Sequence, residues 1–335
     1  KLNGQLGGPD RAKLGEYLEA IRDVEQRIAT GFFRNTLSNR EGGADLEEFR
    51  NLQVVDRTGT FGITWLGLTL SCAECHDHKY DPISQRDFYQ LFAFFNNVPE
   101  VGNGGAEPNA PPLARVLTVA DEAKAVEYEK RVETARGGLG TLKQQPEAPE
   151  DQIVEAKERV AALEKEQKQF LKGFPTTMVM AEMEKPRDTF ILTRGLYNQP
   201  GAQVGADVPA ALPPLPADAP KNRLTLARWL VSSENPLTSR VTVNRFWKMY
   251  FGRGLVSTVD DLGTQGEAPT HPELLDWLAG QFVSDGWSLK KLHRRIMLSQ
   301  TYRLSSDARQ SDIRDPRSKD PENIYLCRFS RRRLE

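Results

Sequence analysis

Apolar residues recur at helical spacing through most of this chain, and this pattern constrains its fold more than any other feature. The first stripe consists of Leu14, Leu18, Ile21, Val24 and Ile28. Its separations of four, three, three and four residues place all five side chains on one face of a helix. Strand-like alternation is confined to a short region near residues 175–195. The sequence therefore predicts a mainly α, multi-helix fold with one short β element.

Capping signals and prolines divide the helical pattern into segments. Ser84 with Asp87, and Thr270 with Glu273, fit the capping-box pattern that opens a helix. A proline-rich stretch at 209–220 is the best linker candidate by composition. After it, helices are expected at about residues 221–232, 236–251, 271–285 and 288–303. Four tryptophans in or beside these helices are expected in the core: Trp229, Trp247, Trp277 and Trp287.

Residues 119–172 differ from the rest because Ala, Glu, Lys, Gln and Leu dominate them. They predict two charged helices joined by the Pro-containing stretch 145–149, which is a helical hairpin. Gly137, Gly138 and Gly140 weaken the first arm. A solvated spacer and an interaction arm both fit such a segment.

Charge and apolar content exclude several classes of protein. The 335 residues carry 45 Lys and Arg against 46 Asp and Glu, a net charge of -1 that argues against a nucleic-acid partner. No apolar run is long enough for a membrane span. Three cysteines are too few for a disulfide scaffold. The chain begins at Lys1 rather than Met and ends without a cap signal, so we expect a fragment or a processed chain.

One motif carries chemistry: Cys72-Ala73-Glu74-Cys75-His76. This Cys-x-x-Cys-His spacing is the one that attaches c-type haem covalently. The two thiols reach the two vinyl groups of the porphyrin, and the next residue, His76, is then placed to bind the iron. Haem c held by Cys72, Cys75 and His76 is therefore the leading interpretation.

Two other interpretations of the motif stay open. Cys72 and Cys75, with His76 or His78, fit part of a zinc site or another metal site. A Cys-x-x-Cys redox pair is the other alternative, although no thioredoxin-like pattern surrounds it. In the haem interpretation, Asp77, His78 and Asp81 are expected to hydrogen-bond around His76. His78 follows His76 too closely to reach the opposite face of the same ring, which leaves these candidates for a sixth ligand: His271, His293, Met178, Met180, Met183, Met249 and Met297.

Several further motifs resemble a known pair of families. The segments are 28–35 (IATGFFRN), 39–43 (NREGG), 55–57 (VDR), 72–82 and 88–97 (FYQLFAFFNN), followed by 194–195, 200–201, 222–224, 236–238, 240–245, 251–255, 271–277 and 332–335. The first group resembles the planctomycete cytochrome-like domain of unknown function. The second group resembles its usual companion, another domain of unknown function. The resemblance covers roughly residues 28–335 and implies that Cys72, Cys75 and His76 are the haem-attachment residues.

The resemblance implies a domain order. An atypical N-terminal helix at 1–27 looks more like a piece of a different planctomycete family. A cytochrome-like domain at 28–118, the hairpin at 119–172 and a truncated companion helical domain at 173–335 follow it.

The leading functional hypothesis is an extracytoplasmic, periplasmic-type c-type haem protein that passes electrons to a redox partner protein. Export is implied because bacterial haem attachment occurs outside the cytoplasm. The alternative is a non-catalytic binding or scaffold module, linked to polysaccharide degradation, in which the Cys/His cluster holds zinc or another metal. An enzyme is the weaker expectation, since no nucleophile, base and orienting group come together in a local motif.

Overall fold

The computed structural model describes residues 26, 28–102, 109–144, 149–306 and 320–330. Within these ranges it contains eight α-helices and two small antiparallel sheets of two strands each. The expected mainly α fold with short β elements is thereby confirmed. Most of the expected stripe from Leu14 to Ile28 falls outside the described residues. None of the helices in the described ranges is long and apolar enough to cross a membrane.

The elements follow one another in this way. The α-helices are α2 (Leu46–Phe61), α3 (Gln85–Phe95), α4 (Val119–Gln144), α5 (Glu150–Lys172), α6 (Arg223–Leu230), α7 (Thr238–Phe251), α8 (Pro272–Ser284) and α9 (Leu289–Met297). The strands are β1 (Leu113–Arg115), β2 (Thr176–Met178), β3 (Thr189–Leu192) and β4 (Pro200–Val204). The short helical turns are η2 (Thr30–Arg34), η3 (Gly62–Leu66), η4 (Leu70–Glu74), η5 (Thr193–Gly195) and η6 (Thr301–Arg303).

The chain divides into two compact units, each built from two separate stretches of sequence. Unit 1 comprises Lys1–Gly42 and Asn103–Glu182. Unit 2 comprises Gly43–Gly102 and Met183–Glu335. The proline-rich stretch 209–220 lies inside unit 2, where the Trp229 indole N–H donates to the Pro213 carbonyl at 2.7 Å.

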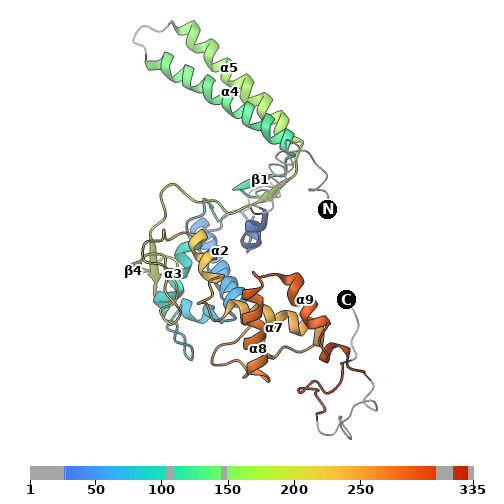
Figure 1. The fold of residues 1–335 in the computed structure, drawn as a ribbon. Helices are drawn as coiled ribbons and strands as arrows, with labels where there is room; N and C mark the ends of the chain where they lie inside the picture. Colours follow the sequence, from blue (N-terminus) through green and yellow to red (C-terminus); the bar gives the residue numbers. More distant parts are fainter. Residues whose placement is uncertain (1–25, 27, 103–108, 145–148, 307–319, 331–335) are drawn as a thin grey trace, which may run out of the picture. The chain divides into compact units, whose positions relative to one another are not determined.

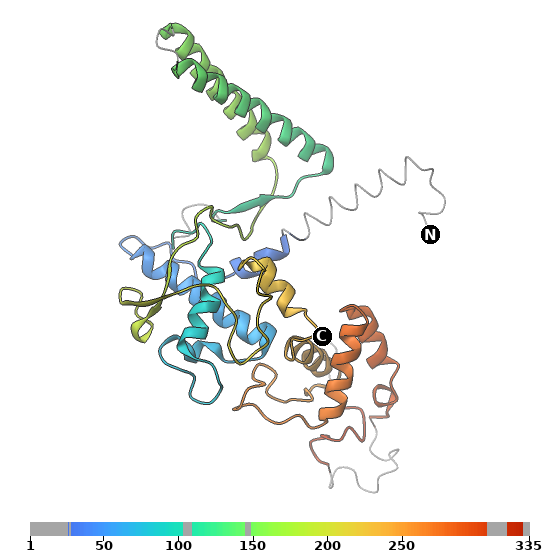
Figure 2. The same ribbon diagram turned by 60° about the vertical axis from the view of Figure 1, so that its left-hand side comes forward.

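Unit 1 contains the expected helical hairpin. Helices α4 and α5 run side by side (Figure 1; Figure 2). Along the seam, Val132 and Val160 are buried, and the rings of Tyr128 and Phe170 lie 5.3 Å apart. The three glycines of the first arm do not interrupt α4, which continues to Gln144. At the base of the hairpin, β1 pairs with β2 in antiparallel register.

The first part of unit 2 is a core between α2 and α3. Asp45 caps α2 by accepting the Glu47 and Glu48 amide N–H groups, and the expected Ser84–Asp87 capping box opens α3. The buried aromatic face of α3 then packs on the end of α2. The buried aromatic residues of this core are Phe61 of α2 and Phe88, Tyr89, Phe92, Phe94 and Phe95 of α3. Such a face removes a large apolar area from water and fixes the two helices against each other.

Helices α7, α8 and α9 surround a second core in unit 2. Its buried members include Val243, Trp247, Phe251, Leu278, Phe282, Leu292 and Ile296. Two expectations fail here. The Thr270 hydroxyl donates to the Leu255 carbonyl instead of capping α8, whose N-cap is His271 without a side-chain hydrogen bond. Trp277 is 52% exposed rather than buried, because its side of α8 faces an open hollow.

Each of the two sheets contains one strand from the region of predicted alternation and one strand from outside it. Strands β2 and β3 lie where the alternation near 175–195 predicts them, but they do not pair with each other. Strand β2 pairs with β1, which lies in a stretch rich in Gly, Pro and Asn. Strand β3 pairs with β4 and brings the turn η5 beside the Cys-x-x-Cys-His motif.

Candidate functional site

The Cys-x-x-Cys-His motif begins in the short 3₁₀ helix η4, and Cys75 is the C-cap residue of that helix. Two glycines at the end of α2 and the start of η3 let η4 approach closely. A Cβ on Gly62 would lie 2.5 Å from Leu70 Cγ, and one on Gly59 would lie 2.4 Å from Ser71 Oγ. Because Leu70 is fully buried, η4 can occupy this place only if residue 62 has no side chain.

Two side chains of α3 hold the backbone in the middle of the motif. The Glu74 carbonyl accepts hydrogen bonds from Gln85 Nε2 at 2.8 Å and from the Tyr89 hydroxyl at 3.1 Å. Gln85 Nε2 also donates to the Leu192 carbonyl at 3.1 Å, at the end of β3. Burial raises the pKa of the Tyr89 hydroxyl, and the nearby Glu74 carboxylate raises it further, so Tyr89 stays a donor at neutral pH. The segment between the two cysteines is thus held by two side chains of α3.

Both cysteines of the motif are free and exposed. Cys75 Sγ lies against the turn η5, since a Cβ on Gly195 would be 3.1 Å from it. This partial burial raises the pKa of the Cys75 thiol, and the Glu74 carboxylate raises it further. Burial likewise raises the pKa of Glu74. The exposed thiols are open to a reactant that approaches from solvent.

His76 is exposed and oriented by its own loop. Its Nδ1–H donates to the Asp77 carbonyl at 2.6 Å. This bond fixes the tautomer and leaves Nε2 as the nitrogen with a lone pair. Histidines that bind metals generally have this arrangement, in which one ring nitrogen donates to a carbonyl or carboxylate and the other is the ligand.

His78 has a different environment, because its side chain is only 4% exposed. Its Nδ1 accepts the Asp81 backbone N–H at 2.8 Å, and its Nε2 is 3.2 Å from the Thr69 hydroxyl. Both ring nitrogens therefore have hydrogen-bond partners within the polypeptide. His78 closes the loop after the motif, and Asp81 extends that support by accepting the Thr264 N–H at 2.7 Å.

The side chains of the expected polar neighbours, Asp77, His78 and Asp81, hydrogen-bond within the loop and to the elements beside it. Asp77 Oδ1 accepts the Gln85 backbone N–H at 2.8 Å, which joins the loop to the start of α3. Asp81 contacts His78 and Thr264, as described above. Asp77 orients His76 through its backbone carbonyl instead.

The donor atoms of the motif differ in how well they suit the two kinds of metal group. Within the described residues, no group of three or more His, Cys, Asp and Glu side chains could hold a metal ion. A closed structural zinc site normally needs four such ligands, so this geometry does not fit one. Two exposed thiols followed by an imidazole with a free nitrogen do fit haem c, in which the porphyrin ring supplies the remaining in-plane ligands.

The histidines and methionines considered as sixth ligands have partners or positions outside the motif. His293 Nδ1 is 2.6 Å from the Tyr250 hydroxyl, and His271 Nδ1 is 2.9 Å from the Thr270 hydroxyl. The Met183 backbone N–H donates to the Asn97 carbonyl at 3.1 Å, beyond the C-terminal end of α3, whereas the motif contacts the N-terminal part of that helix. Met249 and Met297 are exposed on α7 and α9. Met178 and Met180 belong to unit 1.

Sequence reasoning missed three residues of this site. Gln85 and Tyr89 lie 10 and 14 positions after Cys75 on a helix whose aromatic content indicates only packing, and Gly195 lies on a separate turn. A helical projection from Ser84 would have placed Gln85 and Tyr89, four residues apart, on the same face of α3. Nothing in the local sequence connects that face with the motif.

Comparison with protein families places two domains on the chain. Residues 9–100 match a model described as a protein of unknown function (DUF1549), and residues 222–335 match one described as a protein of unknown function (DUF1553). The chain carries these two planctomycete-type domains in this order. The DUF1549 match begins at residue 9, so it includes most of the segment 1–27 that we expected to resemble a different family. No curated protein and no solved structure matches the chain.

The motif lies in the DUF1549 match, while α7, α8 and α9 lie in the DUF1553 match. Inside unit 2 the two matched segments contact each other. Arg245 of α7 donates to the Thr64 carbonyl at 2.6 Å and to the Ile63 carbonyl at 2.7 Å, next to the residues that support η4. The DUF1553 segment therefore contributes to holding the motif in place.

Proposed function

We propose that this chain is a c-type haem protein in which Cys72 and Cys75 form the thioether bonds and His76 Nε2 binds the iron. The observation that carries the proposal is the His76 Nδ1–H bond to the Asp77 carbonyl, next to two free, exposed thiols. It leaves the imidazole in the tautomer that a metal ligand requires. When bound, the haem supplies reversible one-electron exchange, and an electron-transfer role with a redox partner protein follows from that chemistry.

The polypeptide has three tasks in this function. Gln85 and Tyr89 hold the Glu74 carbonyl, which keeps the two thiols presented on one short turn. Asp77 orients His76, and His78 closes the loop behind it. The proposal includes an extracytoplasmic location, because covalent haem attachment in bacteria takes place after export.

The decisive experiment uses the chain exported together with a c-type haem maturation system. A pyridine haemochrome spectrum of the purified protein should show a c-type band that persists after denaturation and acid extraction. Cys72→Ala with Cys75→Ala should remove the band. Cys327→Ala is the matched control, because Cys327 is the chain's third cysteine and lies outside the motif. The control variant should retain the band.

Two further measurements separate this function from the alternatives. Titration with a reductant and reoxidation should cycle the haem spectrum reversibly. Metal analysis should give about one iron per chain and no zinc. A folded wild-type protein that leaves the maturation system with zinc and without covalent haem would refute the proposal in favour of a scaffold module with a structural metal.

A further inference from the structure

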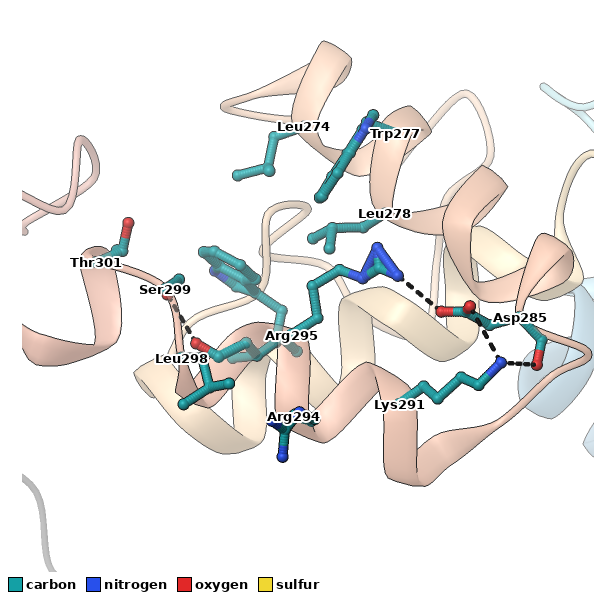
Figure 3. A pocket seen from close by; sticks show the side chains of 12 residues that line it. Leu274, Trp277, Leu278, Asp285, Lys291, Arg294, Arg295, Leu298, Ser299 and Thr301 are labelled. Carbon is teal, nitrogen blue, oxygen red and sulfur yellow. Dashed lines mark hydrogen bonds and ion pairs between the residues drawn. The ribbon is translucent and has the colours of Figure 1, made fainter.

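Helices α7, α8 and α9 leave an open hollow of about 580 Å³ on the DUF1553 part of unit 2 (Figure 3). Its volume lies within the range of small-molecule sites, about 300–1,000 Å³. Its lining comes from α8, from α9 and the turn that follows it, and from Trp247 of α7, which is almost fully buried. None of the motif residues Cys72, Cys75 and His76 lines it.

The hollow has an apolar lining that is open to water. Figure 3 shows Leu274, Trp277 and Leu278 of α8 facing the side chains of α9 across the cavity. Trp277 is 52% exposed and Leu298, at the far end, is 59% exposed. Because these large apolar side chains remain in contact with water, they do not gain the free energy of burial. Contiguous exposed apolar surface of this kind marks binding sites.

Cations collect at one end of the hollow. Arg295 Nη2 is 2.8 Å from Asp285 Oδ2, and Lys291 Nζ is 3.4 Å from Asp285 Oδ1. Two positive side chains thus share one carboxylate, which leaves a net positive charge beside the apolar wall. The Arg295 guanidinium also lies 5.4 Å from the centre of the Trp277 ring, so the charge and the exposed aromatic side chain are adjacent.

Arg294 contributes a third positive charge at the edge of the hollow. Arg294 lines the hollow but turns its guanidinium away from Trp277, toward solvent (Figure 3). Its charge adds to the positive potential at this end of the cavity. The opposite end has the hydroxyl groups of Ser299 and Thr301, which carry no charge.

We propose that this hollow binds an amphiphilic anion, a molecule with an aliphatic or aromatic body and one carboxylate or similar negative head. The body would cover Leu274, Trp277 and Leu298, and the head would lie beside Lys291 and Arg295. Charge complementarity selects an anion over a neutral or cationic ligand, and the apolar lining selects an amphiphile over a simple inorganic anion.

Calorimetric titration of the full chain with three probes of equal chain length tests this selectivity. Octanoate should bind, while octan-1-ol should bind about five- to tenfold more weakly and octyltrimethylammonium more weakly still. Lys291→Gln should reduce octanoate affinity about fivefold and leave octan-1-ol unaffected. Lys290→Gln makes the same charge change on the same helix outside the hollow and should leave both affinities unchanged.

The aromatic wall is tested separately. Trp277→Ala should weaken octanoate and octan-1-ol together, with circular dichroism confirming that the helices persist. Equal affinity for the acid and the alcohol in wild type would overturn the proposal, as would an octanoate affinity that is unchanged in both Lys291→Gln and Trp277→Ala.

The anion could come from free acids or from a lipid surface, and sedimentation with anionic phosphatidylglycerol vesicles separates these sources. Octanoate binding without vesicle binding supports a free acid as the ligand. Binding of both supports a lipid headgroup that presents the same chemistry. Vesicle binding without octanoate binding overturns the proposal, because the charge of the surface and not the hollow would then explain it.

Discussion

At the scale of single residues, the fold changes the acid–base chemistry of two neighbours in the motif, Glu74 and Cys75. Cys75 Sγ lies against Gly195, and the Glu74 side chain approaches the same glycine, since a Cβ there would be 3.1 Å from Glu74 Oε1. Burial and the carboxylate both raise the pKa of the thiol. A raised thiol pKa means less thiolate at a given pH, and therefore slower reaction with electrophiles.

Glu74→Gln should consequently accelerate alkylation of Cys75 by iodoacetamide. Removing the negative charge lowers the thiol pKa, so the rate profile moves toward lower pH and the rate near pH 8 rises about twofold. The measurement uses haem-free protein with Cys72→Ser and Cys327→Ser, which leaves one thiol of the original three. Glu234→Gln, at an exposed position, is the control. An unchanged pH profile in Glu74→Gln would show that the carboxylate has no influence on the thiol.

At this scale, sequence predicts most where a motif depends on local spacing. Cys72, Cys75 and His76 lie within five consecutive positions, and their assignment to haem attachment stays a prediction from that order alone. Gln85, Tyr89 and Gly195 were missed because their role depends on contacts across the fold. Trp277 was misplaced for the same reason: a helical pattern marks an apolar side but does not show whether a neighbouring element covers it.

At the scale of elements, the junction between α2 and η4 determines where the motif sits. Gly62→Ala should destabilise unit 2, because the new Cβ would meet the fully buried Leu70 side chain at 2.5 Å and the Leu68 carbonyl at 3.0 Å. We expect a loss of about 1–2 kcal/mol in the free energy of unfolding and less haem attached by the maturation system.

The matched control is Gly280→Ala in α8, where an added Cβ meets no atom within 4 Å. This substitution should raise stability by up to about 1 kcal/mol, since alanine favours a helix interior more than glycine does. Chemical denaturation of both variants provides the comparison. If Gly62→Ala were as stable as Gly280→Ala, the close approach would have no energetic consequence.

Helices and strands were predicted correctly where the residues at their ends determine the structure without help from distant parts of the chain. The Ser84–Asp87 box and the helices after residue 220 were predicted well because caps and helical periodicity are local. Thr270 has the sequence of a cap, but its hydroxyl donates to the Leu255 carbonyl, so a tertiary partner replaced the local one. Strand β1 was not predicted for a similar reason, because its three residues show no alternation and it forms by pairing with β2.

At the scale of the whole molecule, each unit is assembled from two stretches of chain, and the hairpin is an insertion in the sequence of unit 2. Composition separated the hairpin from its surroundings, but it could not show that residues 43–102 and 183–335 form one unit. That grouping rests on long-range contacts such as Arg245 with Thr64 and Asp81 with Thr264. The composition of the proline-rich stretch is that of a linker, but the hydrogen bond from Trp229 to the Pro213 carbonyl attaches it to unit 2.

Replacing 117–174 by an Asn-Gly turn should leave unit 2 folded and able to receive haem. Arg115 pairs with Thr176, and the Val116 N–H donates to the Pro175 carbonyl at 3.0 Å, so a two-residue turn can connect the strands. Unit 2 does not include α4 or α5, and its cores need no residue from them. The shortened and full chains should therefore give the same haemochrome yield and the same melting transition for unit 2. Loss of haem attachment in a shortened chain that still folds would instead assign the hairpin a role in maturation, and a chain that fails to fold would show that unit 2 depends on it.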